Sequence, residues 1–352
     1  MNRKRISSTM LLLLVLLNIL FLLANIEAAA AADGVIAFLS SRNSKPPNRG
    51  IKTTIYLINA DGTNERKWLE NRRCGYYSPT WSPDGRFVAF STCANDSVHI
   101  FVKDLRTSRQ KRITHKWAGV YPGYLVRSWS GDGKSLALSC WEAPPHDASD
   151  ICIIDVEGRR LKNLTQLPGV EDSSPSWSPD SSKIAFTSSR DGNDEIYVMD
   201  ADGGSPVNLT KHSRTDAAPD WSPDGKRIVF YSDREGQSDI YVMNPDGANL
   251  VKLTDHPAQD RLPSWSPDGR WIAFMSTRED RNWEIYVMDA TGNNQTRITN
   301  HPFAVDVKPV SRVTNHPDKD VRPVWVIPDR SLSVNPQGNH ATLWGQLKSD
   351  KQ

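Results

Sequence analysis

Short apolar segments alternate with turns rich in Pro, Asp and Gly along most of the chain, and this alternation repeats. Each repeat begins with Trp and Ser, followed by a turn that contains Asp. The five copies start at Trp81, Trp129, Trp177, Trp221 and Trp265. Their spacings are 48, 48, 44 and 44 residues, which is close to the size of one propeller blade.

Each repeat is expected to contain four short strands. The Trp ends the first strand, and the second and third follow as apolar runs such as Ile184-Ala-Phe186 and Ile196-Tyr-Val-Met199. A shorter fourth strand ends near a Leu-Thr pair such as Leu209-Thr210. Tight turns between short strands predict an antiparallel meander. Because such a sheet cannot bury both of its faces alone, we predict that the repeats stack radially as an all-β propeller of four-stranded blades.

The two ends of the repeat region complete each other. The segment after Gly34 carries only the later strands of a repeat, Val35-Ile-Ala-Phe38 and Ile55-Tyr-Leu-Ile58. The missing first strand is found near the other end, at Val321–Trp325. We therefore predict a six-bladed propeller over residues 33–328, closed by pairing of the C-terminal strand into the first blade. This closure would remove the open sheet edges.

The first 32 residues predict a secretory signal peptide. Arg3, Lys4 and Arg5 precede an apolar run from Met10 to Leu23, and small residues follow it at 28–32. The alternative is an uncleaved signal that anchors the protein in a membrane. We expect a periplasmic or secreted protein whose residues 329–352 form a polar C-terminal tail.

The charge balance excludes a partner held by net charge. The chain has 43 Lys and Arg against 41 Asp and Glu, and removal of the predicted signal leaves 40 of each. Nucleic-acid binding needs an excess of positive charge, so it is not expected. The sequence also carries no Gly-x-Ser-x-Gly, His-Glu-x-x-His or phosphate-binding loop motif. We therefore expect no enzyme activity and no cofactor.

The repeat resembles that of a known family. Pro-x-Trp-Ser-Pro-Asp-Gly, then Ile-Ala-Phe-x-Ser-x-Arg, Ile-Tyr-Val-Met-Asp and Leu-Thr is similar to the repeat of TolB-like β-propellers, and the match runs from Gly34 to Ile327. The resemblance implies an exported, non-catalytic scaffold, expected to be a monomer, that binds an envelope protein or lipoprotein peptide at its channel mouth. The α/β domain that precedes the propeller in TolB has no expected counterpart here. The same repeat also occurs in propellers of peptidases and in stand-alone secreted propellers.

Acidic and basic residues recur together in four of the six predicted blades. An Asp stands five residues before the repeat Trp, at the start of the innermost strand, and an Arg follows in the Ser-x-Arg context after the second strand. The pairs are Asp172 with Arg190, Asp216 with Arg234, Asp260 with Arg278, and Asp320 with Arg42. In the other two blades both members are missing. This joint presence favours structural Asp–Arg pairs.

Two alternatives remain for these carboxylates. A ring of Asp side chains at the channel mouth is also the kind of site that binds Ca²⁺, although we expect no resident metal. The second alternative is a glycan-binding or glycan-cleaving propeller that uses the mouth carboxylates, because paired carboxylates are the machinery of glycoside hydrolysis.

Histidines recur after the Leu-Thr pairs. They are His115, His212, His256, His301 and His316. A ring of imidazoles suggests zinc, but each one follows the outermost strand, roughly 14 Å from the innermost strand at the usual strand spacing. We therefore predict that these side chains pack within their loops.

Blades two and three differ from the others. Tyr76 and Tyr124 replace the Asp, and Ala94 and Glu142 replace the Arg. Aromatic residues and an Arg gather in the same segments, and such residues are typical of binding anchors. The predicted partner-binding residues are Tyr76, Tyr77, Trp117, Tyr121, Tyr124, Arg127, Trp141 and Glu142. Core packing is the alternative for about half of them.

All four cysteines also fall in blades two and three. Cys140 and Cys152 flank the loop after the second strand of blade three, and Cys74 and Cys93 bracket the first two strands of blade two. In an exported protein we favour disulfides Cys140–Cys152 and Cys74–Cys93. Free buried thiols are the alternative.

Overall fold

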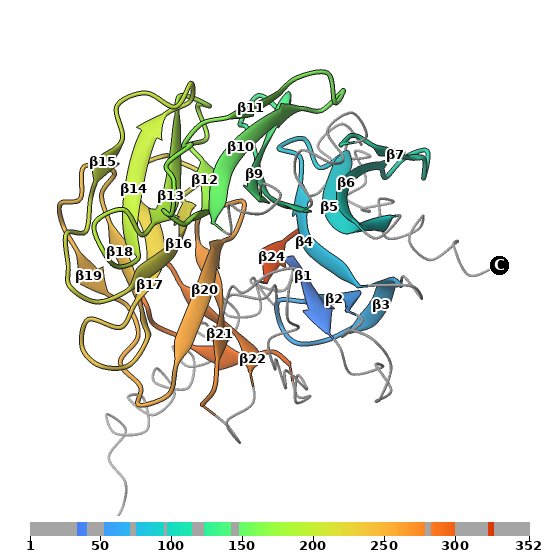
Figure 1. Ribbon diagram of the computed structural model, residues 1–352. Coiled ribbons are helices and arrows are strands. Elements are labelled where there is room, and N and C mark those ends of the chain that lie inside the picture. The colour runs from blue at the N-terminus through green and yellow to red at the C-terminus, as the bar shows by residue number, and fades with distance from the viewer. Residues whose placement is uncertain are drawn as a thin grey trace, which may run out of the picture.

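The protein folds as a ring of six four-stranded antiparallel sheets (Figure 1). The computed structural model describes residues 34–40, 53–70, 75–94, 97–114, 123–141, 148–278, 283–299 and 323–326. In these segments the secondary structure is all strand and turn, so the predicted six-bladed all-β propeller is confirmed. The same segments contain no helix long and apolar enough to cross a membrane. The predicted signal peptide and C-terminal tail lie outside the described residues.

The strands of each blade are named from the axis of the ring outward, so the innermost strand comes first. Blade one contains β24 (Val324–Trp325), β1 (Val35–Ser40), β2 (Thr54–Asn59) and β3 (Arg66–Leu69). Blade two contains β4 (Tyr76–Trp81), β5 (Phe87–Ala94), β6 (Ser97–Asp104) and β7 (Gln110–Arg112). Blade three contains β8 (Gly123–Trp129), β9 (Ser135–Trp141), β10 (Ser149–Asp155) and β11 (Leu161–Asn163).

The second half of the ring follows the same order. Blade four contains β12 (Asp172–Trp177), β13 (Lys183–Ser188), β14 (Glu195–Asp200) and β15 (Val207–Asn208). Blade five contains β16 (Asp216–Trp221), β17 (Ile228–Ser232), β18 (Asp239–Met243) and β19 (Val251–Lys252). Blade six contains β20 (Asp260–Trp265), β21 (Trp271–Ser276), β22 (Glu284–Asp289) and β23 (Thr296–Arg297).

The C-terminal strand closes the ring, as the sequence predicts. In β24, Trp325 pairs with Ile36 of β1 in antiparallel register. The indole Nε1 of Trp325 also donates a hydrogen bond to the carbonyl of Ser264 in blade six at 3.1 Å. Gly34 is required beside this indole, because a Cβ there would lie 2.4 Å from Cζ3 of Trp325. The closing strand therefore joins blades one and six.

The Trp-Ser-Pro-Asp-Gly motif forms the turn between the first and second strands. In blade two, Ser82 Oγ donates to Asp84 Oδ1 at 2.5 Å and accepts the amide of Phe87 at 2.9 Å. Gly85 adopts a φ of 73°, which glycine reaches without steric cost. The Ser–Asp bond recurs at Ser130 with Asp132, Ser178 with Asp180, Ser222 with Asp224, and Ser266 with Asp268.

Blade three departs from this motif for a packing reason. Gly131 stands where the other copies have Pro, and a Cβ at this position would lie only 1.8 Å from the carbonyl oxygen of Pro179 in blade four. The next residue, Asp132, donates its amide to Ser181 Oγ at 3.1 Å. The motif turns of blades three and four therefore touch through their backbones, which requires glycine.

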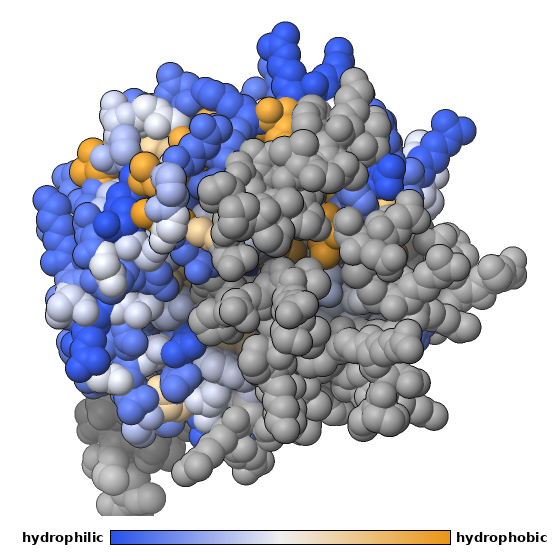
Figure 2. Space-filling model, in the orientation of Figure 1, coloured by the Kyte–Doolittle hydropathy of each residue, from blue (hydrophilic) through white to orange (hydrophobic). Residues whose placement is uncertain are grey.

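The hydrophobic core lies between neighbouring blades. One cluster joins Trp221, Phe230 and Tyr241 of blade five to Ile196 and Val198 of blade four, and other adjacent blades form similar clusters. The repeat thus buries the sheet faces that a single blade would expose. Figure 2 shows mostly hydrophilic colours on the coloured surface of one face, with apolar residues in small separate spots.

Hydrogen bonds beside the axis connect the innermost strands. In blades three to five, the residue before the repeat Trp is the acceptor for the next blade: Ser128 Oγ accepts the amide of Trp177 at 3.0 Å, and Ser176 Oγ accepts that of Trp221 at 3.2 Å. Asp220 Oδ2 accepts the amide of Trp265 at 2.8 Å. These bonds fix the relative height of blades three to six.

Candidate functional site at the channel mouth

The innermost strands of blades four to six begin with an aspartate at one face of the ring. β12, β16 and β20 start at Asp172, Asp216 and Asp260, and all three side chains are fully buried. Strand direction alternates within a blade, so the loops that follow the second strands lie at this same face. The strand starts and these loops build the channel mouth.

Each of these aspartates binds an arginine from the loop after the second strand of its own blade. The Nη2 atoms lie 3.2 Å from Oδ2 for Arg190 and Asp172, 3.0 Å from Oδ1 for Arg234 and Asp216, and 2.7 Å from Oδ2 for Arg278 and Asp260. The arginine side chains are themselves only 13–15% exposed. In a buried pair of this kind, loss of one partner leaves an uncompensated charge.

Aromatic rings hold the same arginines, which explains the Phe-x-Ser-x-Arg sequence. In blade four, Arg190 Nε donates to Ser188 Oγ at 2.7 Å, and its guanidinium carbon lies 5.3 Å from the ring centroid of Phe186 and 4.5 Å from that of Tyr197. Cation–π contacts of this geometry are attractive. Blades five and six repeat them through Arg234 with Phe230 and Tyr241, and Arg278 with Phe274 and Tyr286.

These contacts leave the three aspartates covered rather than presented to a ligand. In the part of the chain that the structure describes, no three His, Cys, Asp or Glu side chains are placed to hold a metal ion. The fourth predicted pair, Asp320 with Arg42, lies outside the described residues.

A second acidic position, which the sequence reasoning missed, is buried at the start of the third strand. Glu195, Asp239 and Glu284 are at most 3% exposed. Asp239 accepts a hydrogen bond from Thr254 Oγ1 at 3.2 Å and lies 3.1 Å from Lys252 Nζ. Burial raises the pKa of Asp239 although these contacts oppose the shift. The sequence signal was the acidic residue directly before each apolar third strand.

Comparison with known proteins identifies the repeat. A family model described as the TolB beta propeller domain matches residues 29–216 and 207–303. The chain belongs to the TolB beta-propeller family. The Tol-Pal system protein TolB of Bordetella pertussis is 29% identical over 172 residues, which are 49% of this chain and 37% of that protein. The chain thus spans little more than a third of the length of this curated relative.

Solved TolB structures share the fold. The crystal structure of TolB from Acinetobacter baumannii has a TM-score of 0.65 and 24% identity, and the match covers 84% of this chain and 67% of that one. The structure of a putative TolB from Agrobacterium tumefaciens has a TM-score of 0.58 and 23% identity, covering 76% of this chain and 88% of that one. These likenesses extend the TolB-like architecture to nearly the whole described ring.

The expectation that Tyr124 lies on the binding surface of this TolB-like propeller is wrong. Its side chain is fully buried in a core cluster with Ile100, Ile113 and Cys140. The physical reason is that the aligned position in blades four to six, occupied by Asp172 in blade four, is also fully buried. Tyr124 therefore fills with one aromatic ring a position that the other blades fill with an ion pair.

Three other predicted partner-binding residues of the TolB-like propeller are partly buried. They are Tyr77, Arg127 and Trp141. Arg127 stands where the other inner strands have Pro, and its Nη1 donates to Ser78 Oγ of blade two at 3.4 Å. Trp141 packs over Gly123, where a Cβ would lie 3.2 Å from the indole Cε3.

The side chains of the other four predicted partner-binding residues are not described. Tyr76 pairs through its backbone with Thr92, but its side chain is not among those described. Trp117, Tyr121 and Glu142 lie outside the described residues.

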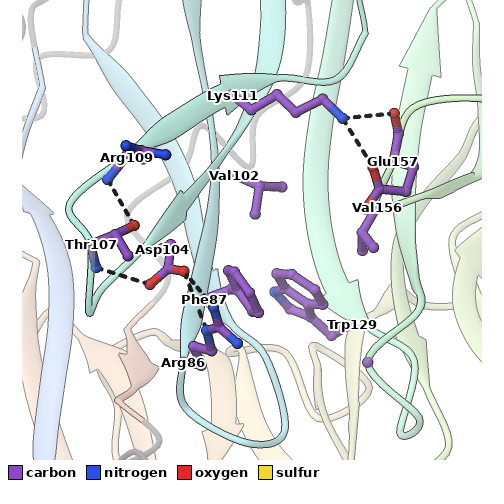
Figure 3. Close-up of a pocket in the computed structure, with 11 residues that line it drawn as sticks. Arg86, Phe87, Val102, Asp104, Thr107, Arg109, Lys111, Trp129, Val156 and Glu157 are labelled. Atoms are coloured by element: carbon purple, nitrogen blue, oxygen red, sulfur yellow. Dashed lines mark hydrogen bonds and ion pairs between the residues drawn. The ribbon is translucent and has the colours of Figure 1, made fainter.

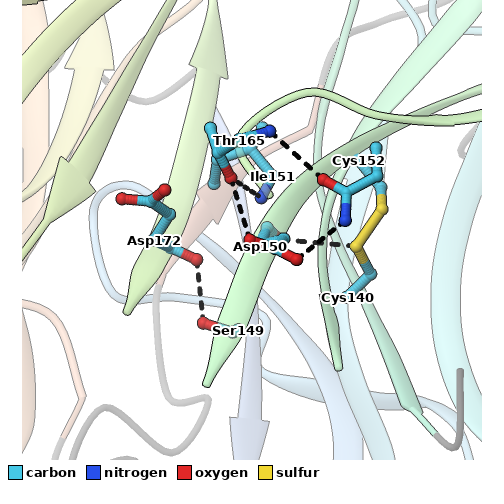
Figure 4. Close-up of a disulfide and its surroundings, with 8 residues drawn as sticks. Cys140, Ser149, Asp150, Ile151, Cys152, Thr165 and Asp172 are labelled. Atoms are coloured by element: carbon cyan, nitrogen blue, oxygen red, sulfur yellow. Dashed lines mark hydrogen bonds between the residues drawn. A yellow bond between two sulfur atoms is a disulfide. The ribbon is translucent and has the colours of Figure 1, made fainter. Parts of the chain in front are cut away.

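A disulfide joins Cys140 and Cys152 in blade three (Figure 4). Both side chains are fully buried, and the bond links β9 to β10 beside the mouth. On β10, Ser149 Oγ donates to the carbonyl of Asp172 at 2.8 Å, so the cross-linked strands also hold the start of blade four (Figure 4). For the predicted Cys74–Cys93 bond, Cys74 and the side chain of Cys93 lie outside the description.

Two of the histidines predicted to pack within loops are described, and each accepts a hydrogen bond from its own loop. His212 Nδ1 accepts the amide of Arg214 at 3.2 Å, and His256 Nδ1 accepts that of Ala258 at 3.1 Å. This geometry agrees with loop packing. His115, His301 and His316 lie outside the described residues.

Proposed function

We propose that this chain is an exported, non-catalytic binding scaffold whose partner is a protein or peptide of the cell envelope and docks at the channel mouth. Family membership supports this proposal, because curated relatives are named Tol-Pal system proteins. We propose the same kind of role for this chain, together with a periplasmic or secreted location.

The observation that carries the proposal is the asymmetry of the mouth. In blades four to six, buried ion pairs occupy the strand starts and fix the loops above them. In blade three, Tyr124 and the disulfide replace this arrangement. The proposed partner contact lies along blades two and three, where Tyr77, Arg127 and Trp141 are partly accessible. Aromatic residues and Arg are enriched among residues that carry binding energy in interfaces.

A second arginine of an innermost strand offers a comparison on another side of the ring. Arg261 of β20 is partly buried, and its Nε donates to Ser238 Oγ at 3.0 Å. Its guanidinium carbon lies 5.4 Å from the ring centroid of Tyr231 and 5.9 Å from that of Trp283. Arg127 lies on the innermost strand of blade three and Arg261 on that of blade six, so the two arginines mark different sides of the ring.

Site-specific photocrosslinking tests the location of the partner. A photoreactive amino acid at Tyr77 is expected to crosslink an envelope protein or peptide in cells. The same group at Val207, which is 53% exposed on the outer strand β15, is expected not to capture it. Equal capture from both positions would contradict docking at the mouth, and recovery of an oligosaccharide from Tyr77 would favour the glycan alternative.

Affinity measurements on the captured partner test the edge of the mouth. Arg127→Ala is expected to weaken binding about tenfold, the loss of one interface anchor, whereas Arg261→Ala changes it less than about twofold. Circular dichroism and urea unfolding show whether both variants remain folded. The reverse order of effects in folded variants would place the partner on the side of blades five and six.

A further inference from the structure

A cavity of about 420 Å³ opens between blades two and three on the face opposite the predicted mouth (Figure 3). It lies beside the turns between first and second strands and between third and fourth strands, whereas the mouth carries the loops after second strands. Its size falls in the range of pockets for small organic ligands.

The inner wall of the cavity is apolar. Phe87 and Val102 of blade two face Trp129 and Val156 of blade three (Figure 3). The indole of Trp129 is anchored, because its Nε1 donates to the carbonyl of Thr80 at 3.0 Å. The wall is therefore a preformed surface for an aromatic or branched aliphatic group.

The corresponding space between blades five and six is filled by the protein itself. Arg227 occupies the position that Phe87 holds in blade two, six residues after the repeat Trp. Its guanidinium carbon lies 4.5 Å from the ring centroid of Trp265, and its Nη1 donates to the carbonyl of Ala290 at 3.3 Å. The interface of blades two and three thus differs from that of blades five and six, where an arginine covers the repeat Trp.

The rim of the cavity carries three cationic and two anionic side chains. Asp104 is satisfied by Arg86 Nη2 at 2.8 Å and by the backbone amides of Arg106 and Thr107. Although burial opposes the shift, the hydrogen bonds to Arg86 and to these amides lower the pKa of Asp104. This carboxylate and Arg86 therefore neutralise each other.

The other two cationic side chains at the rim, Lys111 and Arg109, can bind an incoming anion. Lys111 Nζ lies 3.2 Å from Glu157 Oε2 across the gap between the blades, and both side chains are 55% exposed. Exposed pairs of this kind contribute little to stability, so a competing anion can replace Glu157 at small cost. No carboxylate of the described residues lies within ion-pair distance of the Arg109 guanidinium at the same rim. One net positive charge remains.

We infer that this cavity binds a small organic carboxylate with an aromatic or branched aliphatic body. The body packs on Phe87, Val102 and Trp129, and the carboxylate lies between Arg109 and Lys111. Charge-assisted hydrogen bonds to Arg and Lys provide the polar anchor. The inference goes beyond the proposed scaffold function, since the cavity lies on the other face and needs no envelope partner.

Titration with N-acetylphenylalanine tests the inference in the full chain. The indole N–H signal of Trp129, assigned with Trp129→Phe, is expected to shift saturably in ¹⁵N NMR spectra with a Kd on the order of 1 mM. N-acetylphenylalaninamide, which keeps the ring and lacks the charge, is expected to bind at least about fivefold more weakly. Equal affinity for acid and amide, or no saturable shift up to about 10 mM, would overturn the inference.

Variants of the rim test the position of the carboxylate. Arg109→Gln combined with Lys111→Gln is expected to weaken binding about tenfold or more. Lys162→Gln is the matched control, since Lys162 holds the same position in blade three and its Nζ contacts the carbonyl of Asp202 at 2.6 Å. Its Kd should stay within about twofold of the parent value. Equal weakening by both changes would mean that the rim does not select the anion.

A variant whose side chain fills the cavity gives an independent test of where the ligand binds. Val102→Phe places a larger apolar side chain on the inner wall without changing charge, and it is expected to abolish the titration shift. An unchanged Kd in a folded Val102→Phe protein would place the ligand elsewhere and overturn the inference.

Discussion

Arg234 Nη2 lies 3.0 Å from Oδ1 and 3.1 Å from Oδ2 of Asp216, a fully buried carboxylate. The same guanidinium packs on the rings of Phe230 and Tyr241. One contact thus joins the start of an innermost strand to the loop above it. The repetition of this contact in three consecutive blades makes it a unit of the fold at the channel mouth.

Asp216→Ala is expected to lower the free energy of unfolding by about 3–5 kcal/mol, because Arg234 would remain as a buried, unpaired charge. Urea unfolding followed by tryptophan fluorescence measures the change. Asp216→Ala combined with Arg234→Ala should cost less than the sum of the two single changes, since both charges are then removed.

The matched control for that experiment is Lys183→Met. Lys183 Nζ lies 2.9 Å from Asp200 Oδ1, but both side chains are nearly half exposed. Its loss is expected to cost less than about 1 kcal/mol. Equal effects of Asp216→Ala and Lys183→Met would contradict a special role of the buried pair.

Cys140→Ala combined with Cys152→Ala is expected to lower the free energy of unfolding by about 2–4 kcal/mol, because the bond closes a short loop and restricts the unfolded chain. Substitution is preferable to chemical reduction, which would also act on any bond formed by Cys74 and Cys93. A midpoint of urea unfolding equal to that of the parent protein would argue against this contribution.

Gly131→Ala is expected to destabilise the protein by about 3 kcal/mol, at the upper end of overpacking costs. The added Cβ would lie 1.8 Å from the carbonyl oxygen of Pro179, a backbone atom that cannot rotate away. Gly133→Ala serves as the comparison. Its φ of +70° makes Ala strained, at about 1 kcal/mol, but the nearest atom is Cδ of Pro83 at 3.8 Å. A larger loss for Gly133→Ala in thermal unfolding would be inconsistent with blade contact at Gly131.

Asp224 predicts a pH dependence of stability. The hydrogen bond from Ser222 Oγ lowers the pKa of Asp224 below its ordinary value, although burial opposes this shift. A carboxyl group with a lowered folded-state pKa adds stability above its unfolded pKa and loses it as the pH falls through the folded value. Asp224 is exposed, so solvent screens its charge, and Asp224→Asn should cost no more than about 0.5 kcal/mol at pH 7 and progressively less from pH 4 toward pH 2.

Urea unfolding of Asp224→Asn and the parent protein across that pH range measures this difference. Ser222→Ala removes the hydrogen-bond donor to Asp224 and also the acceptor of the Arg227 amide, so its cost should decrease in acid without vanishing. A gap between Asp224→Asn and the parent protein that stays constant from pH 7 to pH 2 would show that the charge of Asp224 is not involved.

The fold could be predicted because its signals are local and repeated. The turn bonds of Ser82 and Asp84 and the apolar strand patterns recur in every copy of the motif, so blade number and ring closure followed from counting. Tyr124 was misplaced because a strand start looks exposed in sequence, whereas the neighbouring blade covers it. The cavity was missed because it depends on Phe87 standing where another blade has Arg227, and sequence spacing does not show which space a side chain fills.

The pairing of Ile36 with Trp325 imposes an order on folding. These partners are 289 residues apart, whereas the strands of blades two to six pair within single repeats. Local pairings form faster than distant ones, because a long loop must lose more entropy before its ends meet. Blades two to six can thus assemble as the chain is synthesised, while the β1 edge of blade one stays unpaired until β24 is available. Closure of the ring is therefore the last step of folding. The propeller stays open until Val324 and Trp325 have been synthesised and have paired with β1.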